Sequence, residues 1–335
     1  MNRKAIALLS GGLDSTLAVK LMIEQGIDVS AIHFTSVFCN CTPKKAGCKL
    51  QAGKIAAEFK IPIRVINKGM DYIRMVERPP HGYGSGMNPC IDCRIYMLRK
   101  VRDMLPHMEA SFVITGEVLG QRPMSQHRNT LRLIERESGL EGLILRPLSA
   151  KHFDPTLPEQ EGIVDRNLLL PLSGRSRKPQ IELAKELDIR DYPCPAGGCL
   201  LTDKETAARL RDLFVHCPDY DIVDLHLLKV GRHFRLNPRL KIIVGRDARE
   251  NEKIKSFAGT GAMLIEPCDF RGPTVYVRGK TDETSEAAIG RIIARYSQDR
   301  KKEYHLRKRI IGNRDYVFIV KDRYPVEELD AFRIS

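Results

Sequence analysis

Apolar segments alternate with amphipathic ones along the first 115 residues. The apolar run 4–9 ends in a glycine turn, and apolar residues at helical spacing follow over 15–25. The same order recurs further along, which is typical of a parallel sheet with helices on both faces. The sequence therefore predicts an α/β fold with a doubly wound parallel sheet. Further strands are predicted over 29–34, 63–66 and 112–115, and further helices over 50–59 and 96–104.

The pattern changes near residue 205. Beyond it the apolar runs are short, as at 240–244 and 274–277, and turns that contain arginine and glycine separate them. A chain of 335 residues is also longer than one average domain. We therefore expect a boundary within 205–225, between a first domain at 1–204 and a smaller α+β domain at 225–335.

Hydropathy and cysteine content indicate where such a protein works. No apolar run reaches the roughly 18 residues that a membrane-spanning helix needs, and the basic, apolar N-terminus runs into Ser10-Gly11-Gly12 as a first strand would. Nine cysteines without a secretion signal indicate a reducing compartment, where clustered thiols are metal ligands or catalytic groups more often than disulfides. We therefore expect a cytoplasmic protein with no membrane partner.

The net charge of +13 favours a polyanionic partner, because lysine and arginine release counterions from phosphates. Residues 291–314 hold nine basic side chains and two acidic ones. Charge by itself does not distinguish RNA from DNA or from an anionic membrane.

A seven-residue string at 10–16, Ser-Gly-Gly-Leu-Asp-Ser-Thr, joins the first predicted strand to the first predicted helix. Backbone N–H groups and the helix dipole converge on an anion at such a turn, and glycines let the main chain approach a phosphate closely. An aspartate there can hold Mg²⁺ through a carboxylate oxygen. The alternative is a tight turn in which Ser15 only caps the helix. The candidate ligands are Ser10, Gly11, Gly12, Asp14, Ser15 and Thr16.

The string SGGLDS resembles the PP-loop of ATP pyrophosphatases, which have an adenine nucleotide alpha hydrolase-like fold. The resemblance implies that the turn binds the pyrophosphate end of ATP, and that the enzyme activates a carbonyl as an adenylate. The segment 115–126 resembles the TG-x-x-x-GQ-x-x-SQ segment of tRNA 4-thiouridine synthetases, although Arg122-Pro123 departs from it. The stretch 169–184 resembles the region that closes the adenylate site in these enzymes. The further nucleotide-site residues implied are Gly116, Gln121, Ser125 and Gln126.

Two cysteines stand at CxxC spacing just before a predicted helix, whose N-terminal dipole favours thiolate. The segment around them resembles the N-P-x-x-x-C segment of tRNA 2-thiouridylases, with Cys93 at the position of the cysteine. Cys199, in a glycine-containing segment, aligns with the second catalytic cysteine of that family. The resemblance implies that Cys93 and Cys199 are catalytic, together with Asp14.

Two sulfur-transfer mechanisms are open. In one, Cys199 carries a persulfide that attacks the activated uridine carbon, and Cys93 resolves it as a disulfide. In the other, Cys90, Cys93 and Cys199 hold a 4Fe-4S cluster with one open iron for sulfide, which resembles the iron-sulfur-dependent tRNA thiolases. The CxxC spacing favours the cluster. Zinc with Cys194 as a fourth ligand is a purely structural alternative. The sulfur donor would be sulfide or a persulfide carrier.

The remaining cysteines are less informative. Cys39, Cys41 and Cys48 fall on the predicted loop after the second strand, which should cross the mouth of the site. They could bind a separate metal, relay sulfur or be idle thiols. Cys217 and Cys268 have no partner at useful spacing, and we expect both to be buried apolar residues.

The segment of about 230–325 resembles the NFACT RNA-binding domain of ribosome-quality-control proteins, beginning with the string KIIVGRDARENE at 241–252. The resemblance implies phosphate contacts by its basic residues and stacking of unpaired bases on Tyr296 and Tyr304. The alternative is a solvated basic face. The RNA-binding candidates are Arg246, Arg249, Lys301, Lys302, Arg307, Lys308 and Arg309.

Together these features predict ATP-dependent tRNA thiolation, in which a uridine carbonyl is adenylated and sulfur replaces its oxygen. One alternative is an adenylating enzyme that acts on a small molecule. Another is a non-catalytic RNA-binding protein that senses ATP, but such a protein has no need of Cys93 and Cys199. The uridine, the choice of C2 or C4 and the oligomeric state do not follow from the residues.

Overall fold

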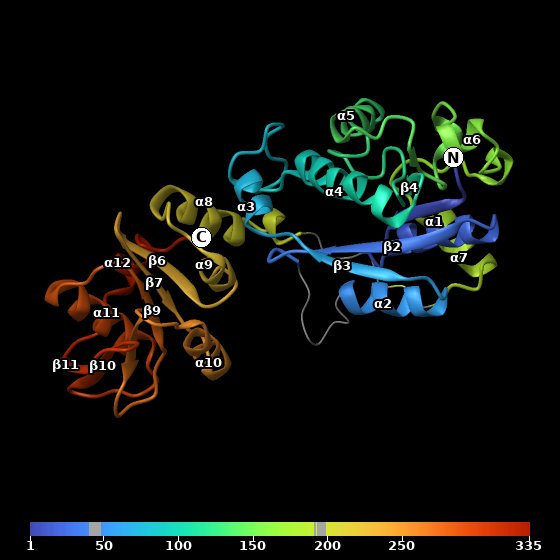
Figure 1. Ribbon diagram of the computed structural model, residues 1–335. Helices are drawn as coiled ribbons and strands as arrows, with labels where there is room; N and C mark the ends of the chain where they lie inside the picture. The colour runs from blue at the N-terminus through green and yellow to red at the C-terminus, as the bar shows by residue number, and fades with distance from the viewer. Residues whose placement is uncertain (40–47, 191, 193–198) are drawn as a thin grey trace. The chain divides into compact units, whose positions relative to one another are not determined.

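The computed structural model describes residues 1–39, 48–190, 192 and 199–335. The chain forms two compact units, Met1–Thr202 and Asp203–Ser335 (Figure 1). No helix in these described ranges is long and apolar enough to cross a membrane.

The first unit is built on a sheet of five strands that all run parallel, in the order β3-β2-β1-β4-β5. Its strand order extends outward on both sides of β1, as in doubly wound folds. The predicted α/β fold with a doubly wound parallel sheet is confirmed. The strands are β1 (Lys4–Leu8), β2 (Asp28–Thr35), β3 (Ile63–Asn67), β4 (Phe112–Ile114) and β5 (Ile144–Leu145).

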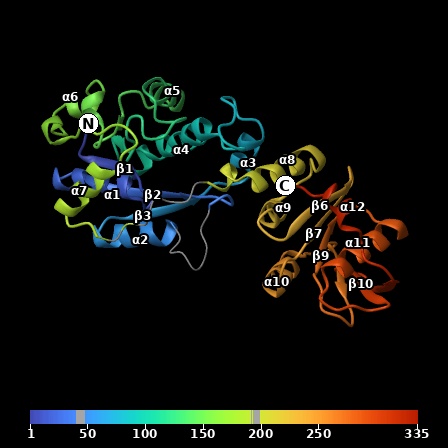
Figure 2. The ribbon, with the colours of Figure 1, turned by 180° about the vertical axis from the view of Figure 1, so that it is seen from behind.

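Helices cover both faces of this sheet (Figures 1 and 2). Because side chains alternate along a strand, Ala5 and Ala7 of β1 pack on one face and Ile6 on the other. The face with the alanines is covered by α1 (Leu13–Glu24), α2 (Cys48–Glu58) and α7 (Lys178–Glu186), and the opposite face by α4 (Cys90–Met104) and α5 (Arg128–Ser138). The shorter helices are α3 (Met70–Glu77) and α6 (Leu157–Gln160).

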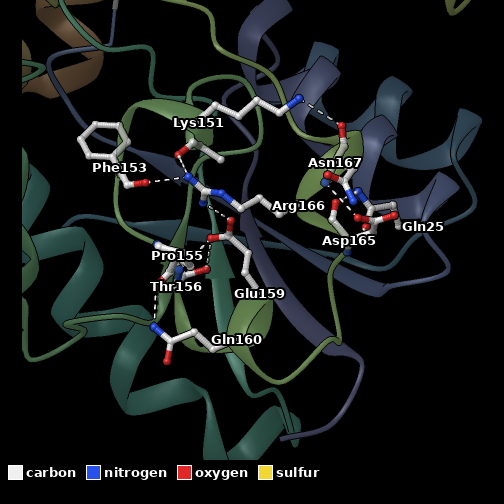
Figure 3. A network of polar contacts seen from close by, with 11 residues as sticks. Gln25, Lys151, Phe153, Pro155, Thr156, Glu159, Gln160, Asp165, Arg166 and Asn167 are labelled. Atoms are coloured by element: carbon white, nitrogen blue, oxygen red, sulfur yellow. Dashed lines mark hydrogen bonds and ion pairs between the residues drawn. The ribbon is translucent and has the colours of Figure 1, made fainter.

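A polar network fixes the segment that follows β5 (Figure 3). The Arg166 guanidinium donates to Glu159 at 2.5 Å and to the carbonyl of Phe153 at 2.8 Å. The backbone N–H of Asp165 donates to the Gln25 side chain at the end of α1, at 2.8 Å. The segment is thereby tied to α1, and it leads into Ser173, which forms a parallel bridge with Leu119.

The second unit contains a six-stranded antiparallel sheet in the order β11-β10-β8-β9-β7-β6. α11 packs on one face through Ile289 and Ile293, and Leu227 of α9 with Ile254 of α10 covers part of the other. The strands are β6 (Arg232–Asn237), β7 (Leu240–Val244), β8 (Met263–Pro267), β9 (Val275–Arg278), β10 (Tyr304–Ile310) and β11 (Tyr316–Val320). The helices are α8 (Lys204–His216), α9 (Ile222–Leu227), α10 (Ala248–Phe257), α11 (Glu283–Tyr296) and α12 (Val326–Asp330).

Two local features differ from the sequence prediction. The helix expected over 96–104 begins six residues earlier, at Cys90, so the CxxC pair lies inside α4 rather than before it. The expected boundary segment 205–225 is mostly helical, because α8 and α9 occupy it and pack with the second unit. In α8, Asp212 pairs with Arg235 and Lys241 of that unit's sheet, each at 2.8 Å.

Candidate functional site

The turn between β1 and α1 is held by its own hydroxyl groups. Gly11 has φ of +80°, which glycine adopts without strain. The hydroxyls of Ser15 and Thr16 both donate to the carbonyl of Gly12, at 2.9 and 3.0 Å. The Ser10 hydroxyl lies 3.0 Å from that of Ser15. The turn is therefore pre-formed, and the first turn of α1 presents its N–H groups and positive dipole end there.

Asp14 lies in the first turn of α1, and its carboxylate contacts two polar side chains. Its Oδ2 accepts a hydrogen bond from Gln121 Nε2 at 2.8 Å and lies 3.5 Å from Arg177 Nη2. Its Oδ1 is buried and has no hydrogen-bond partner within the described part of the chain. A buried carboxylate oxygen is costly unless it is satisfied, so this atom fits a cation such as Mg²⁺.

Gly116 brings the end of β4 against the nucleotide turn. A Cβ at this position would lie 2.5 Å from the backbone carbon of Asp14 and from the backbone nitrogen of Ser15, so only glycine fits. The following loop closes on itself, because the N–H of Gly120 donates to the carbonyl of Gln126 at 2.7 Å. Ser125 and Gln126 are buried, and Gln126 Oε1 has no hydrogen-bond partner among the residues described.

Both segments lie at the carboxyl edge of the sheet. β1 and β4 are neighbours and parallel, and their connecting segments leave toward opposite faces. In open α/β sheets such a switch point is where ligands bind. The structure therefore places the turn at 10–16 and the segment at 115–126 side by side, as a nucleotide site requires.

The CxxC pair lies in the first turn of α4, one helical turn apart. Cys93 Sγ accepts hydrogen bonds from Lys68 Nζ at 3.5 Å and from the Tyr72 hydroxyl at 3.6 Å. The Lys68 ammonium also lies 4.2 Å from the centre of the Tyr72 ring. Two donors, one of which is a cation, therefore contact the sulfur of Cys93.

Cys199 faces the same region from the end of the first unit. Its Sγ donates to the carbonyl of Phe38 at 3.8 Å, and the N–H of Leu200 donates to that carbonyl at 3.1 Å. Burial raises the pKa of the Cys199 thiol to about 11, with a contribution from the nearby Cys93. Cys199 is therefore held as a neutral thiol.

The buried Tyr72 lies near three cysteines. Burial raises the pKa of its hydroxyl, and charge repulsion from Cys93, Cys199 and Cys39 raises it further. Cys90 lies at the edge of this region, and its pKa is raised by burial and then by Cys93. The structure thus brings together the two predicted catalytic cysteines and adds Cys39 to them.

The described side chains were compared with the requirements of a metal site. Within the described ranges, no three Cys, His, Asp and Glu side chains lie close enough to hold one metal ion. This finding concerns a single metal ion, and a 4Fe-4S cluster held by Cys90, Cys93 and Cys199 stays a prediction from spacing. Cys41 and Cys194 lie outside the described residues, as does the side chain of Cys48.

A buried ion-pair network connects the thiols to the nucleotide turn. Glu117, next to Gly116, lies 3.4 Å from Arg94, the neighbour of Cys93, and 3.1 Å from Arg146. Burial raises the pKa of Glu117, but the two arginines outweigh it and the net shift is downward. Glu117 is therefore an ionised anchor between the start of α4 and the end of β4.

In the second unit, most of the predicted RNA-binding side chains are paired with acids. Arg246 contacts Glu250 at 2.5 Å, and Lys308 contacts Glu286 at 2.6 Å. Arg249 and Lys302 are exposed and have no ion pair among the described residues. The remaining pairs are Lys301–Asp269 at 2.8 Å, Arg309–Asp315 at 3.4 Å, Arg309–Glu266 at 3.6 Å and Arg307–Asp315 at 3.9 Å.

One aromatic prediction and one cysteine prediction need correction. Tyr304 is 2% exposed, because it faces the core beneath α11, so the prediction that it stacks on bases is wrong. Tyr296 is half-buried, with the Arg232 guanidinium 4.5 Å from its ring centre. Cys217 is buried as expected, but Cys268 is exposed.

Comparison with known proteins agrees with this arrangement. The family model described as thiamine biosynthesis protein (ThiI) matches residues 1–153. This match lies within the first unit. The model of the NFACT protein RNA binding domain matches residues 231–329, within the second unit. Both family resemblances predicted from the sequence are confirmed.

Individual relatives cover only part of the chain. The tRNA-specific 2-thiouridylase MnmA of Dehalococcoides mccartyi is 27% identical over 193 residues, 54% of this chain and 49% of that protein. The probable tRNA sulfurtransferase of Methanothermobacter thermautotrophicus is 30% identical over 202 residues, 58% of this chain and 43% of that protein. A solved complex of a 4-thiouridine synthetase with RNA and bound ATP is 21% identical, covers 56% of this chain and 51% of that one, and has a TM-score of 0.36. The chain spans less than half the length of the two curated relatives.

Sequence reasoning missed two side chains of the candidate site in the first unit. Arg177 precedes α7 and contacts Asp14, and Gln180 of α7 donates to Gln121 Oε1 at 3.1 Å. Gln180 is buried, and its Oε1 has no hydrogen-bond partner in the described ranges. The only signal was the resemblance of 169–184 to a region that closes an adenylate site, which singled out neither residue.

Proposed function

We propose that the chain is an ATP-dependent tRNA thiolation enzyme. One observation carries the proposal: the pre-formed turn at 10–16 and the thiols of Cys93 and Cys199 belong to the same unit and are connected through Glu117 and Arg94. An enzyme that activates a carbonyl and then replaces its oxygen by sulfur needs a phosphate site and a nucleophilic sulfur together. The ThiI family match and relatives named as tRNA sulfurtransferase and 2-thiouridylase support this reading.

In the activation step, the turn and the N-terminus of α1 bind the phosphates of ATP, and the uridine oxygen attacks the α-phosphate with release of pyrophosphate. Asp14 Oδ1 would hold Mg²⁺, which would neutralise phosphate charge when bound. Gln121 and Arg177 fix the carboxylate through Oδ2, which leaves Oδ1 for this task.

In the transfer step, a persulfide on Cys199 attacks the activated carbon, and AMP leaves with the former uridine oxygen. Cys93 then attacks Cys199 Sγ, the bond between that sulfur and the transferred sulfur breaks, and thiouridine departs. The products are a Cys93–Cys199 disulfide and the proton of the Cys93 thiol. Lys68 and Tyr72 support this attack, because their hydrogen bonds stabilise a thiolate at Cys93.

RNA binding is assigned to the second unit. Its NFACT match and the exposed side chains of Arg249 and Lys302 support contacts to tRNA phosphates. Such contacts position the RNA without reading its sequence.

The test is a reconstituted reaction with ATP, tRNA that lacks thionucleosides, and either a persulfide donor or sulfide, followed by mass spectrometry of the nucleosides. Thiouridine and pyrophosphate should both form, and both Cys93→Ser and Cys199→Ser should abolish thiouridine but keep pyrophosphate release. Cys217→Ser is the matched control, since this buried cysteine lies in the other unit. Pyrophosphate release that does not depend on RNA would refute a tRNA substrate.

Iron and acid-labile sulfide are measured on the same protein after anaerobic purification. About four irons per chain, lost in Cys90→Ala, would establish the predicted cluster and replace the persulfide step by sulfide transfer. Iron-free protein that makes thiouridine from a persulfide donor would establish the step described above.

A further inference from the structure

Cys39 lies in a tight turn directly after β2, at the same sheet edge as Lys68 after β3. The backbone N–H of Ser36 donates to Cys39 Sγ at 3.2 Å, and the N–H of Cys39 donates back to the carbonyl of Ser36 at 3.1 Å. The Ser36 hydroxyl lies 3.7 Å from the same sulfur. The thiol is therefore fixed in place by groups that stabilise negative charge on sulfur.

The neighbouring residue connects this turn to Cys199. The carbonyl of Phe38 accepts hydrogen bonds from both Leu200 N–H and Cys199 Sγ, so the segments 36–39 and 199–202 are held against each other. Phe38 is 1% exposed, which anchors the turn in the interior. Burial raises the pKa of Cys199, and charge repulsion from Cys93 and Cys39 adds to the increase, as expected for three neighbouring sulfurs.

We propose that Cys39 is a third sulfur-transfer residue, which takes the disulfide with Cys199 over from Cys93. The inference rests on the proposed function, and it adds the step that regenerates Cys93. The Cys93–Cys199 disulfide formed in each turnover leaves no thiol at Cys93 until it is exchanged or reduced.

The exchange is balanced without any oxidant. The Cys39 thiolate attacks Cys199 Sγ, the Cys93–Cys199 bond breaks, and Cys93 leaves as a thiolate that takes up the proton released by Cys39. A dithiol reductant then converts the Cys39–Cys199 disulfide to two thiols and is itself oxidised to a disulfide. Lys68 and Tyr72 both donate to Cys93 Sγ, and such contacts assist the departure of Cys93 as the leaving group.

Disulfide mapping tests the exchange without tRNA or ATP. The full-length protein is equilibrated with glutathione disulfide, quenched with acid, alkylated and mapped by peptide mass spectrometry. Both Cys93–Cys199 and Cys39–Cys199 disulfides should be found, and the exposed Cys268 should be recovered as glutathione adduct or free thiol. A Cys93–Cys199 disulfide with Cys39 always alkylated would overturn the proposal.

Turnover measurements separate a relay from a structural thiol. With Cys39→Ser, the first turnover should proceed and later turnovers in the presence of a dithiol reductant should be lost, whereas Cys268→Ser should match the wild type in both. An equal loss of first and later turnovers, or unchanged later turnovers, would refute the relay. If the wild-type protein makes no thiouridine, the proposed function fails, and the disulfide map still decides the role of Cys39.

Discussion

In the first unit, functional side chains from distant parts of the sequence meet at one edge of the sheet, whereas in the second unit most of the candidate RNA-binding side chains already pair with acids. Parallel strands all end at the same edge, so the turns after β1, β2, β3 and β4 converge there. Antiparallel strands end at alternate edges. In the hairpin of β10 and β11, Arg307 and Arg309 accordingly pair with Asp315 of the intervening turn.

The first unit also contains buried polar atoms that lack a hydrogen-bond partner. Asp14 Oδ1, Gln126 Oε1 and Gln180 Oε1 are buried acceptors without a hydrogen bond in the described part of the first unit. They are the groups that a nucleotide, a metal ion or bound water would satisfy. Five of the seven candidate RNA-binding side chains of the second unit are paired with acids, so their number overstates the charge that is free to bind phosphate.

The largest effect on activity is expected from Asp14→Asn, which tests the candidate nucleotide site of the first unit. Loss of one charge-stabilising ligand at a phosphoryl-transfer site should reduce pyrophosphate release by on the order of 10²–10³-fold. Binding of tRNA to the second unit should be unchanged in a filter-binding assay. Asp188→Asn is the matched control, because that carboxylate is exposed and pairs only with Arg190 in the described structure. Normal pyrophosphate release in Asp14→Asn would show that the turn at 10–16 is not the nucleotide site.

Asp212→Asn tests the internal pairing of the second unit. It leaves Arg235 and the buried Lys241 without their shared partner, which should lower the free energy of unfolding by about 3 kcal/mol, measured by urea denaturation. Burial raises the pKa of Asp212, but Arg235 and Lys241 lower it overall. Its contribution to stability is therefore present above the ordinary carboxyl pKa and is lost as pH falls through the lowered value.

The control for this change is Asp330→Asn, whose carboxylate is exposed and lies 4.0 Å from Arg333. It should change the free energy of unfolding by less than about 0.5 kcal/mol. Equal effects of the two substitutions would mean that the buried group in the second unit contributes no more than a surface pair.

Gly116→Ala probes the contact between β4 and the nucleotide turn. The added Cβ would meet the backbone of Asp14 and Ser15 at 2.5 Å, so the turn must shift, at a cost of about 1–3 kcal/mol. ATP binding should weaken with it, as measured by calorimetry. Gly53→Ala in α2 is the control, because its Cβ meets nothing within 4 Å and alanine is the better helix former. Unchanged ATP binding by Gly116→Ala would show that ATP binding does not depend on the contact between the end of β4 and the turn at 10–16.

The smallest expected effects concern single phosphate contacts. Arg249→Ala and Lys302→Ala should each weaken tRNA binding and reduce the slope of its salt dependence by about one. Arg246→Ala should have less effect, because its guanidinium already pairs with Glu250. A larger effect at Arg246 than at Arg249 would show that ion pairs in this unit open when RNA binds.

Much of the site could be predicted because its signals are local. The glycines at 11 and 12, the aspartate at 14 and the end of a strand occur within one short string, and Gly116 and Gln121 occur within another. Base stacking on Tyr304 failed as a prediction because exposure depends on which face of β10 packs under α11. Arg177 and Gln180 were missed because nothing in α7 indicates that it packs against α1.

By itself, the sequence determined the alternation of strands and helices and the glycine turn at 10–16, and it singled out the CxxC pair, since each depends on residues within a few positions of one another. Only the tertiary structure decided that Cys39 joins Cys93 and Cys199, that Lys68 and Tyr72 contact one thiol, and which basic side chains are already paired. Those outcomes depend on strand order and on tertiary packing, which bring together residues that are separate in the sequence, such as Phe38 and Cys199, 161 positions apart.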